Sequence, residues 1–400
     1  MSAETSAPSG EPPRFHPLVG AWIVTRHADA LTVLGNPELF SSRAAYATSL
    51  EELGCPGDVA ARLTAMVPPG TPQMVASDRP EHGRLRPLAT RLFATARIEA
   101  YRSRVGDLAR DLADGLDGPG PVDLHARFTI PFSARAVLRV LGVEAEHAPA
   151  VEALAARATL LFFVKLDDAE KRRSAEALLA LQEALSALLD ERGAKPRDDL
   201  ASALLAANAA EAEPLSRAEL IQLALDLAFA GSEPVGGVLS SFLLRLLATE
   251  GAWRRLAAGP GAVEPMIEEA VRLASGLRGI ARRTTRATEL GGAALEAGAT
   301  VLVIPGPVNR DQTVFAEPGS VRPERPGART HVGFGYGVHY CVGAPLARLE
   351  LKIALCALLE RYPEMRLWPT QPVAFARAPL ITQIARLLVE PGPRRRSGGG

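Results

Sequence analysis

The sequence is poor in cysteine, in net charge and in long apolar runs, and each shortage excludes a class of protein. Three cysteines without a CxxC spacing provide neither a disulfide framework nor a four-thiolate zinc site. The 45 basic residues balance the 45 acidic ones, so no basic excess favours nucleic-acid binding. No run reaches the roughly 18 apolar residues that cross a bilayer, and the N-terminus lacks the features of a signal peptide. We therefore expect a cytoplasmic protein without a nucleic-acid or membrane partner.

Apolar residues at helical spacing dominate what is present. Of the 400 residues, 47% are hydrophobic and 22% charged, enough for a large core. The spacing predicts helices near 100–116, 130–142, 148–163, 168–193 and 198–208, whereas strand patterns are short: 22–25, 300–304 and 385–389. We expect a mainly α fold with a small β portion (α+β), forming a single domain over 18–392 between disordered ends at 1–17 and 393–400.

One predicted helix is long enough to cross the whole domain. Ser216 and Glu219 form a capping-box pattern, and helical spacing then continues to about Glu250. Pro234 interrupts this helix, because proline lacks an amide donor and crowds the carbonyl four residues earlier. The pattern fits an ordinary kink in a buried helix as well as a functional gap.

The most specific segment is FGYGVHYCVGAPLAR, from Phe334 to Arg348. Its glycines, among them Gly335, allow a tight backbone turn. Cys341 then stands just before a helix predicted from about 345 to 361, where free amides stabilise a thiolate. Such a thiolate is a soft metal ligand or a nucleophile. The alternative, a small buried hydrophobic residue, leaves the glycines unexplained; it suits Cys55 and Cys356.

This segment resembles the haem-ligand loop of the cytochrome P450 family, and the resemblance extends along most of the chain. It implies the P450 fold, with a long oxygen-binding helix over haem b, and makes Cys341 the axial ligand of the iron. It also implies that Glu269, Arg272 and Arg325 form a buried network that supports the cysteine loop. Alone, Glu269 and Arg272 would be read as a surface pair worth a few tenths of a kcal/mol.

The same resemblance supplies cations for the two haem propionates. The matching residues are His82, Arg86, Arg282 and His339, while Phe334 and Gly335 belong to the cofactor loop. The i,i+4 spacing of His82 and Arg86 places them on one helix face. Pro87 follows directly, so we expect it to disturb this helix and to weaken the role of Arg86.

The central helix departs from the family pattern at the position of the oxygen chemistry. The family motif has an acid followed by threonine, whose hydroxyl helps to deliver the proton that splits the O–O bond. Here Glu233 keeps the acid, while Pro234 replaces the threonine. Either water, Ser232 or a substrate hydroxyl takes over, or the chemistry differs from ordinary hydroxylation. A peroxide-using branch also has proline there, but after an arginine, so Glu233 disfavours a fatty-acid peroxygenase.

Family position also indicates the substrate contacts, although several are equally typical of plain core. Gly276 replaces a usual proline and loosens one pocket segment, and Arg278 is the one hint of an anionic substrate. The predicted contacts are the 60–76 loop, Leu160–Phe163, Ala230, Glu233, the segment Leu277–Ile280 with Leu277, Arg278 and Ile280, and the segment Ile381–Ile384 with Ile381.

The resemblance implies a monomeric haem-thiolate monooxygenase. It would take electrons from a ferredoxin and a ferredoxin reductase, since the chain has no flavin or nicotinamide motif. Its substrate would be a small organic secondary metabolite, free or tethered to a carrier protein. Arg84, Arg91 and Arg348 are candidates for a basic docking patch. Two alternatives stay open: an atypical oxidase that performs coupling, desaturation, ring formation or peroxide-driven oxidation, and a non-enzymatic haem or gas-binding protein.

Overall fold

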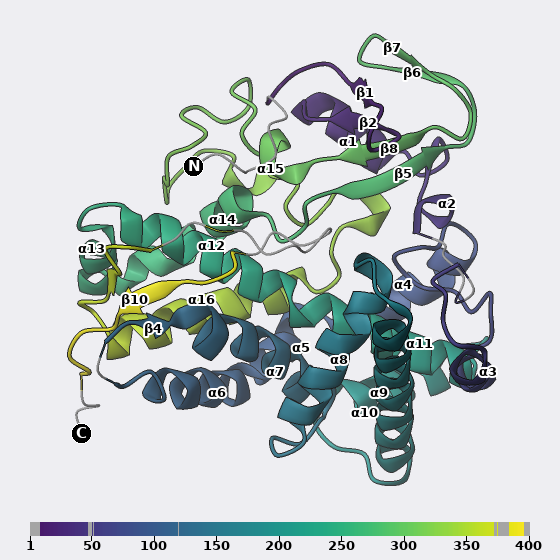
Figure 1. The fold of residues 1–400 in the computed structure, drawn as a ribbon, viewed down its shortest axis with the longest axis horizontal. Helices are drawn as coiled ribbons and strands as arrows, with labels where there is room; N and C mark the ends of the chain where they lie inside the picture. The colour runs from purple at the N-terminus through teal and green to yellow at the C-terminus, as the bar shows by residue number, and fades with distance from the viewer. Residues whose placement is uncertain are drawn as a thin grey trace.

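Helices make up most of the molecule, and the strands gather in small sheets (Figure 1). The structure is a computed structural model that describes residues 9–46, 50, 52–118, 120–371, 374 and 384–395. The mainly α fold with a small β portion is therefore confirmed.

The helices follow the predicted pattern closely. They are α1 His27–Gly35, α2 Arg43–Tyr46, α3 Gly57–Met66, α4 Glu81–Leu92, α5 Thr95–Ala100, α6 Arg102–Asp114, α7 Ile130–Leu141, α8 Ala148–Phe163, α9 Asp168–Ala194, α10 Leu200–Ala209, α11 Arg217–Ser232, α12 Pro234–Ala248, α13 Ala252–Ala258, α14 Val263–Ala274, α15 Pro305–Val308 and α16 Ala344–Arg361. Short helical turns occupy His125–Thr129, Pro260–Ala262, Ala328–Thr330 and Gly337–His339.

The main sheet has five strands in the order β1-β2-β8-β5-β3 and lies at one end of the molecule (Figure 1). β2 and β8 are parallel, and the other pairs are antiparallel. The strands are β1 Arg14–His16, β2 Ala21–Val24, β3 Phe40–Ser41, β4 Val122–Asp123, β5 Ile280–Thr284, β6 Thr288–Leu290, β7 Ala293–Leu295, β8 Thr300–Val303, β9 Arg366–Leu367 and β10 Leu388–Glu390.

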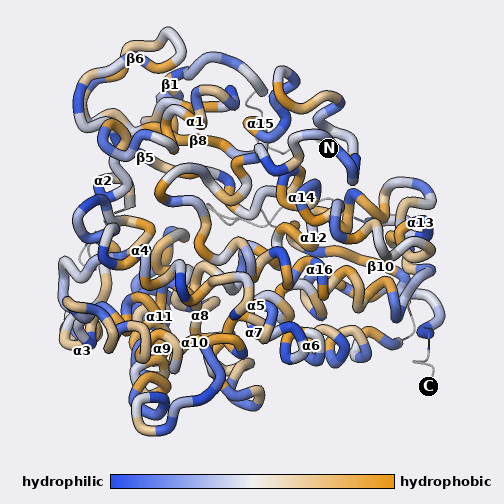
Figure 2. Tube along the Cα trace, turned by 180° about the vertical axis from the view of Figure 1, so that it is seen from behind, coloured by the Kyte–Doolittle hydropathy of each residue, from blue (hydrophilic) through white to orange (hydrophobic). Residues whose placement is uncertain are grey.

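The core lies between the central helices. α12 packs against α14 and α16, and Figure 2 shows these central segments as largely hydrophobic. Ser216 caps α11 in the predicted capping box with Glu219. Together α11 and α12 are long and apolar enough to span a membrane, but 67% of their most apolar window is buried inside the protein. They are therefore a core element.

Parts of both predicted chain ends contact the rest of the protein. Within the segment 1–17, residues 14–16 pair with β2 as strand β1. Within the segment 393–400, Arg394 forms ion pairs with Asp114 and Asp117 at 2.8 and 3.0 Å. Polar composition alone does not reveal such long-range partners.

Candidate active site

Cys341 lies in the loop before α16, after a tight backbone turn. Gly335 and Gly337 have φ of 73° and 72°, a region that glycine adopts without steric cost. A Cβ on Gly337 would lie 2.5 Å from the backbone oxygen of Leu34, so this loop packs closely on α1. The amide of Cys341 donates to the backbone oxygen of Phe334 at 2.8 Å and closes the loop. The glycine pattern thus serves to present Cys341.

Opposing influences act on the Cys341 thiol. Burial raises its pKa, while the backbone amides of Gly343 and Ala344 and the guanidinium groups of Arg86 and Arg348 act to lower it. The amides belong to the start of α16, where the helix dipole favours negative charge. We expected the helix start to favour the thiolate; that contribution exists, but burial is the larger one in the protein alone. A bound metal cation would reverse the balance.

Four side chains predicted to bind anions converge beside this loop. α4 provides His82 and Arg86, β5 provides Arg282, and His339 lies two residues before Cys341. The ring centroids of His82 and His339 are 4.2 Å apart. Burial, followed by the charges of Arg282, His82 and Arg86, lowers the pKa of His339 to about 3. The cluster is therefore one in which further positive charge is disfavoured and a bound anion is favoured.

Two nitrogens of this cluster lack a partner. The Nε2 atoms of His82 and His339 are buried and make no hydrogen bond to any residue that the structure describes. An unmet buried group costs about 1–3 kcal/mol. Two carboxylates, as carried by a haem, would accept hydrogen bonds from these nitrogens and pair with Arg86 and Arg282. The donor set therefore fits the cofactor that the sequence predicted.

The expectation that Pro87 disturbs its helix is wrong. α4 continues through Pro87 to Leu92. Pro87 is exposed, and the helix continues past it although proline provides no amide donor. Arg86 stays close enough to Cys341 for their charges to interact.

This chain resembles known proteins both in sequence and in structure. The family model of cytochrome P450 matches residues 262–375. Mycinamicin IV hydroxylase/epoxidase of Micromonospora griseorubida is 34% identical, over 88% of this chain and 85% of its own length. Nocardicin C N-oxygenase of Nocardia uniformis is 33% identical, over 92% and 89%. The chain belongs to the cytochrome P450 family. The structure of CYP109Q5 from Chondromyces apiculatus, 27% identical, superposes with a TM-score of 0.80 over 95% of this P450 and 91% of that chain.

Membership settles the class of enzyme and the cofactor. The protein is a cytochrome P450 monooxygenase, and its cofactor is a haem whose iron is bound by a cysteine thiolate. P450s of this bacterial type receive electrons from redox partner proteins.

The central helix of this P450 is broken as predicted, between α11 and α12 at Glu233 (φ −110°, ψ −37°). Serine hydroxyl groups donate hydrogen bonds to the backbone carbonyl oxygens around the break. Ser133 of α7 donates to the backbone oxygen of Gly231 at 3.1 Å. The buried hydroxyl of Ser232 lies 2.8 Å from the backbone oxygen of Ala228 and 3.1 Å from that of Phe229. The Ser232 hydroxyl thus caps its own helix, which weakens it as a replacement for the missing threonine.

The two departures from the family motif lie in contact with each other. A Cβ on Gly276 would lie 3.0 Å from Cβ of Pro234 and 3.3 Å from its backbone oxygen, closer than atoms normally pack. A side chain at position 276 would therefore collide with Pro234, and glycine avoids this collision.

Glu269, Arg272 and Arg325 are brought together in one buried network. Arg272 Nε and Arg325 Nε lie 2.6 and 3.0 Å from Glu269 Oε1, and the exposed fractions of the three residues are 0%, 0% and 6%. Backbone oxygens of the segment 309–320 take further donors of both arginines. This network joins α14 to the segment that leads into the cysteine loop.

Sequence reasoning missed the neighbouring Glu268. Its carboxylate binds Arg348 of α16 at 2.6 Å and His331 at 3.1 Å. Burial opposes these contacts, but the hydrogen bonds from His331 and Arg348 dominate and lower the pKa of Glu268 to about 2. Neither i,i+4 spacing nor a sequence motif indicates this role for Glu268, because His331 and Arg348 are 63 and 80 positions away in the sequence.

The basic docking patch is also less basic than expected. Arg348 is paired with Glu268, Arg84 with Glu219 at 3.0 Å, and Arg91 with Glu211. Each charge is therefore largely neutralised by a carboxylate that sequence spacing did not reveal.

The predicted substrate contacts are partly open and partly packed. Ala230 and Leu277 are exposed in spite of their apolar side chains, Arg278 is half-buried, and Ile280 is buried. Phe162 packs edge-on against Phe229 of α11, with centroids 6.2 Å apart, in line with a pocket wall at the end of α8. Ile381 lies outside the described residues, whereas Ile384, at the end of the same predicted segment, is buried in the hydrophobic core.

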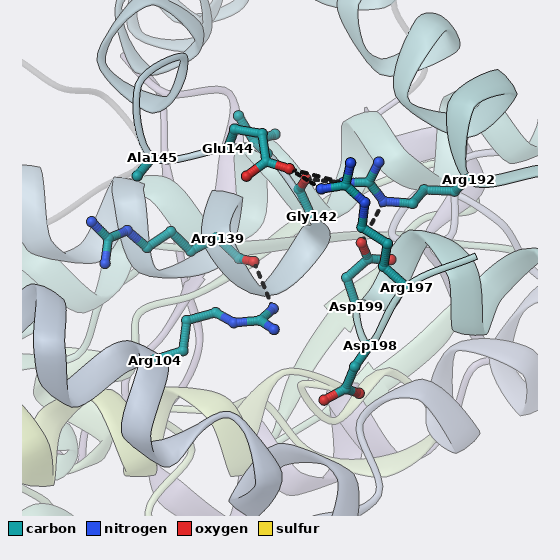
Figure 3. Close-up of a pocket in the computed structure, with 10 residues that line it drawn as sticks. Arg104, Arg139, Gly142, Glu144, Ala145, Arg192, Arg197, Asp198 and Asp199 are labelled. Carbon is teal, nitrogen blue, oxygen red and sulfur yellow. Dashed lines mark hydrogen bonds and ion pairs between the residues drawn. The ribbon is translucent and has the colours of Figure 1, made fainter. Parts of the chain in front are cut away.

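A cavity of about 270 Å³ lies elsewhere, at the junction of α6, α7, α9 and α10 (Figure 3). Arg192, 2% exposed, bonds to Asp199 at 2.5 Å and to the backbone oxygen of Gly142 at 2.7 Å. Asp199 in turn caps α10 through the amide of Ser202. Since none of the predicted site residues lines this cavity, we assign it a structural role.

Proposed function

We propose that this P450 oxidises a small organic molecule of secondary metabolism, with electrons from a ferredoxin and its reductase. Cys341 would bind the haem iron through its thiolate, and His82, Arg86, Arg282 and His339 would hold the propionates. The observation that carries the proposal is the pair of buried nitrogens beside the cysteine loop, the Nε2 atoms of His82 and His339, which have no hydrogen-bond partner among the described residues. Two relatives that act as a mycinamicin hydroxylase/epoxidase and a nocardicin N-oxygenase support a metabolite of similar chemistry.

In this proposal the haem supplies oxygen activation and electron transfer, and the protein positions it. Phe334, over which the Arg348 guanidinium lies at 4.6 Å, and Gly335 shape the loop that presents Cys341. Glu269, Arg272 and Arg325 keep this loop in place. Glu233 offers a carboxyl group at the helix break for proton delivery, and Ala230, Leu277, Arg278, Ile280 and Ile381 surround the substrate.

The helix break favours a second candidate, an oxidation other than simple hydroxylation. Pro234 has no donor, and the Ser232 hydroxyl already bonds to backbone oxygens. Residues 232–234 thus offer no free hydroxyl to assist O–O cleavage. The second candidate is coupling, desaturation, ring formation or peroxide-driven oxidation of the same substrate.

The first test is titration of the ferric protein with a chemically diverse compound panel, followed through the Soret band. A blue shift identifies a substrate class, and its loss in Arg278→Ala indicates an anionic group. A compound that binds only as the carrier-protein conjugate indicates a tethered substrate.

The second test separates the two candidates. With ferredoxin, reductase and NAD(P)H, a product that gains one oxygen atom supports the monooxygenase, whereas a coupled, desaturated or cyclised product supports the second candidate. Turnover with peroxide alone supports its peroxide-driven form. If the missing hydroxyl limits proton delivery, Pro234→Thr raises the product formed per electron pair, while Ser232→Ala leaves it unchanged. A Pro234→Thr variant that loses product would contradict a hydroxylation limited in this way.

A further inference from the structure

A carboxylate on α11 holds the middle of the segment 67–77. Asp226 Oδ2 accepts a hydrogen bond from the backbone amide of Met74 at 3.0 Å. Its Oδ1 accepts one from Gln222 Nε2 at 2.8 Å. Gln222 stands one turn earlier on the same helix, so this second bond fixes the orientation of the carboxylate. A side chain of the central helix is thereby joined to the backbone of a loop 152 positions away.

Apart from the packing of Val67 and Met74 against the hydrophobic core, the other hydrogen bonds of this segment are local or lie at its end. The hydroxyls of Thr71 and Ser77 bond to backbone oxygens three and four residues earlier. At the end of the segment, Asp78 is hydrogen-bonded to Ser41 at 2.5 Å. Short-range bonds do not fix a loop relative to the body of the protein. Among the described residues, the bond to Asp226 therefore provides the long-range hydrogen bond that fixes the Met74 backbone, beside the packing of the Met74 side chain.

The contact is placed on the substrate side of α11. Ala230 and Glu233 follow Asp226 by four and seven residues, so the three share one helix face. Seven residues correspond to roughly 10 Å along the axis, which is within the length of a small organic substrate. Phe229, which packs against Phe162, lies one turn from Asp226.

We propose that Asp226 is a positioning residue that latches residues 67–77 onto α11 and so closes the substrate side of the active site. The identity of the closed space as a substrate pocket rests on the proposed function; the latch itself does not. The latch differs from a catalytic residue because Asp226 acts through the loop and touches no reacting atom.

The surroundings of Asp226 make the latch sensitive to pH. Burial raises the pKa of Asp226 to about 6, against the lowering effect of Gln222 and the Met74 amide. No charged side chain of the described residues, on α11 or on the helices packed against it, contributes to this shift. A protonated carboxyl accepts a hydrogen bond less strongly than a carboxylate. The bond to Met74 should therefore weaken as the pH falls through about 6.

Hydrogen exchange of the Met74 amide in the haem-loaded, full-length protein tests the latch. Asp226→Leu removes both acceptors, and we expect Met74 protection at pH 7.5 to fall by about tenfold or more. Asp226→Asn keeps an acceptor oxygen, so most protection should remain. After correction for intrinsic exchange, wild-type protection should fall about fivefold between pH 7.5 and 5, while Asp226→Asn stays level.

The control is Asp190→Asn, which removes an exposed carboxylate from α9 and should leave Met74 exchange unchanged. Binding of 4-phenylimidazole, followed by haem absorbance, should weaken severalfold in Asp226→Leu. Wild-type protection in Asp226→Leu, or an equal acid-induced fall in Asp226→Asn, would overturn the latch; unaltered 4-phenylimidazole binding would overturn closure. Failure of ferredoxin-supported turnover would overturn the proposed function and leave the Met74 result intact.

Discussion

The Glu269 network and the His82–His339 cluster are both buried and polar, yet only the first is complete. The guanidinium nitrogens of Arg272 bond to Glu269 and to backbone oxygens of the segment 309–320. In the second cluster, the Nε2 atoms of His82 and His339 have no partner among the described residues. Arg86 and Arg282 add positive charge beside them.

The difference separates a structural site from a binding site. A network that satisfies itself contributes to the stability of the chain whether or not a ligand is present. A cluster that leaves buried donors unmet is costly until a ligand of opposite charge arrives. The cost in the free chain is thereby converted into affinity for the cofactor.

The largest effect is expected from breaking the complete network. Glu269→Gln leaves Arg272 and Arg325 buried without a counter-charge, which should destabilise the protein by about 3–5 kcal/mol. The free energy of urea unfolding measures this. Glu99→Gln, which weakens the exposed pair with Arg102, is the control and should cost about 0.5 kcal/mol or less. Equal costs for the two variants would mean that the Glu269 network does not hold the fold.

Most of the helices and the residues of both clusters could be predicted from the sequence. Periodicity and capping signals placed the helices, including the break at Pro234, because these signals are local. The motif around Cys341 and the residues matched to it identified both clusters before their geometry was known. What a motif supplies is the residue type and order.

The remaining contacts depend on three-dimensional proximity, which single residues do not encode. Glu268 binds Arg348 and His331, 80 and 63 positions away, and Asp226 reaches Met74. From the sequence Ser232 is a candidate proton donor, but its hydroxyl bonds to the backbone oxygens of Ala228 and Phe229. Each of these residues has an ordinary neighbourhood in the sequence and gains its role from a partner on another element.

The second-largest effect is expected at Asp226, a half-buried carboxyl that is satisfied by hydrogen bonds but has no counter-charge. Its pKa is raised from 3.8 to about 6, so the folded protein holds the proton more tightly than the unfolded chain. The contribution of this carboxyl to stability therefore falls as the pH rises from about 4 to about 6, and then levels off. Asp226→Asn avoids this loss and should be more stable by up to about 3 kcal/mol at pH 8.

Urea unfolding of both proteins at pH 4, 6 and 8 measures this difference. The advantage of Asp226→Asn should shrink toward zero as the pH approaches 4. A constant difference across the range would mean that the carboxyl titrates alike in the folded and unfolded protein. This gain in stability is the opposite of the loss in Glu269→Gln, because the Asp226 carboxylate has no counter-charge whereas that of Glu269 has two, Arg272 and Arg325.

The smallest effect is expected in the His82–His339 cluster. A substitution there should stabilise the haem-free protein but weaken the haem-loaded one. His82→Leu removes an unmet buried nitrogen, so the haem-free chain should gain about 1 kcal/mol. The haem-loaded protein should instead lose a charge-assisted hydrogen bond and release haem about tenfold faster, as measured by transfer to apomyoglobin. The control is Ser174→Ala, which also removes a buried polar group without a described partner, in this case a hydroxyl. It should stabilise the chain slightly and leave haem release unchanged. A loss of stability in both forms of His82→Leu would place His82 among the structural residues, beside Glu269.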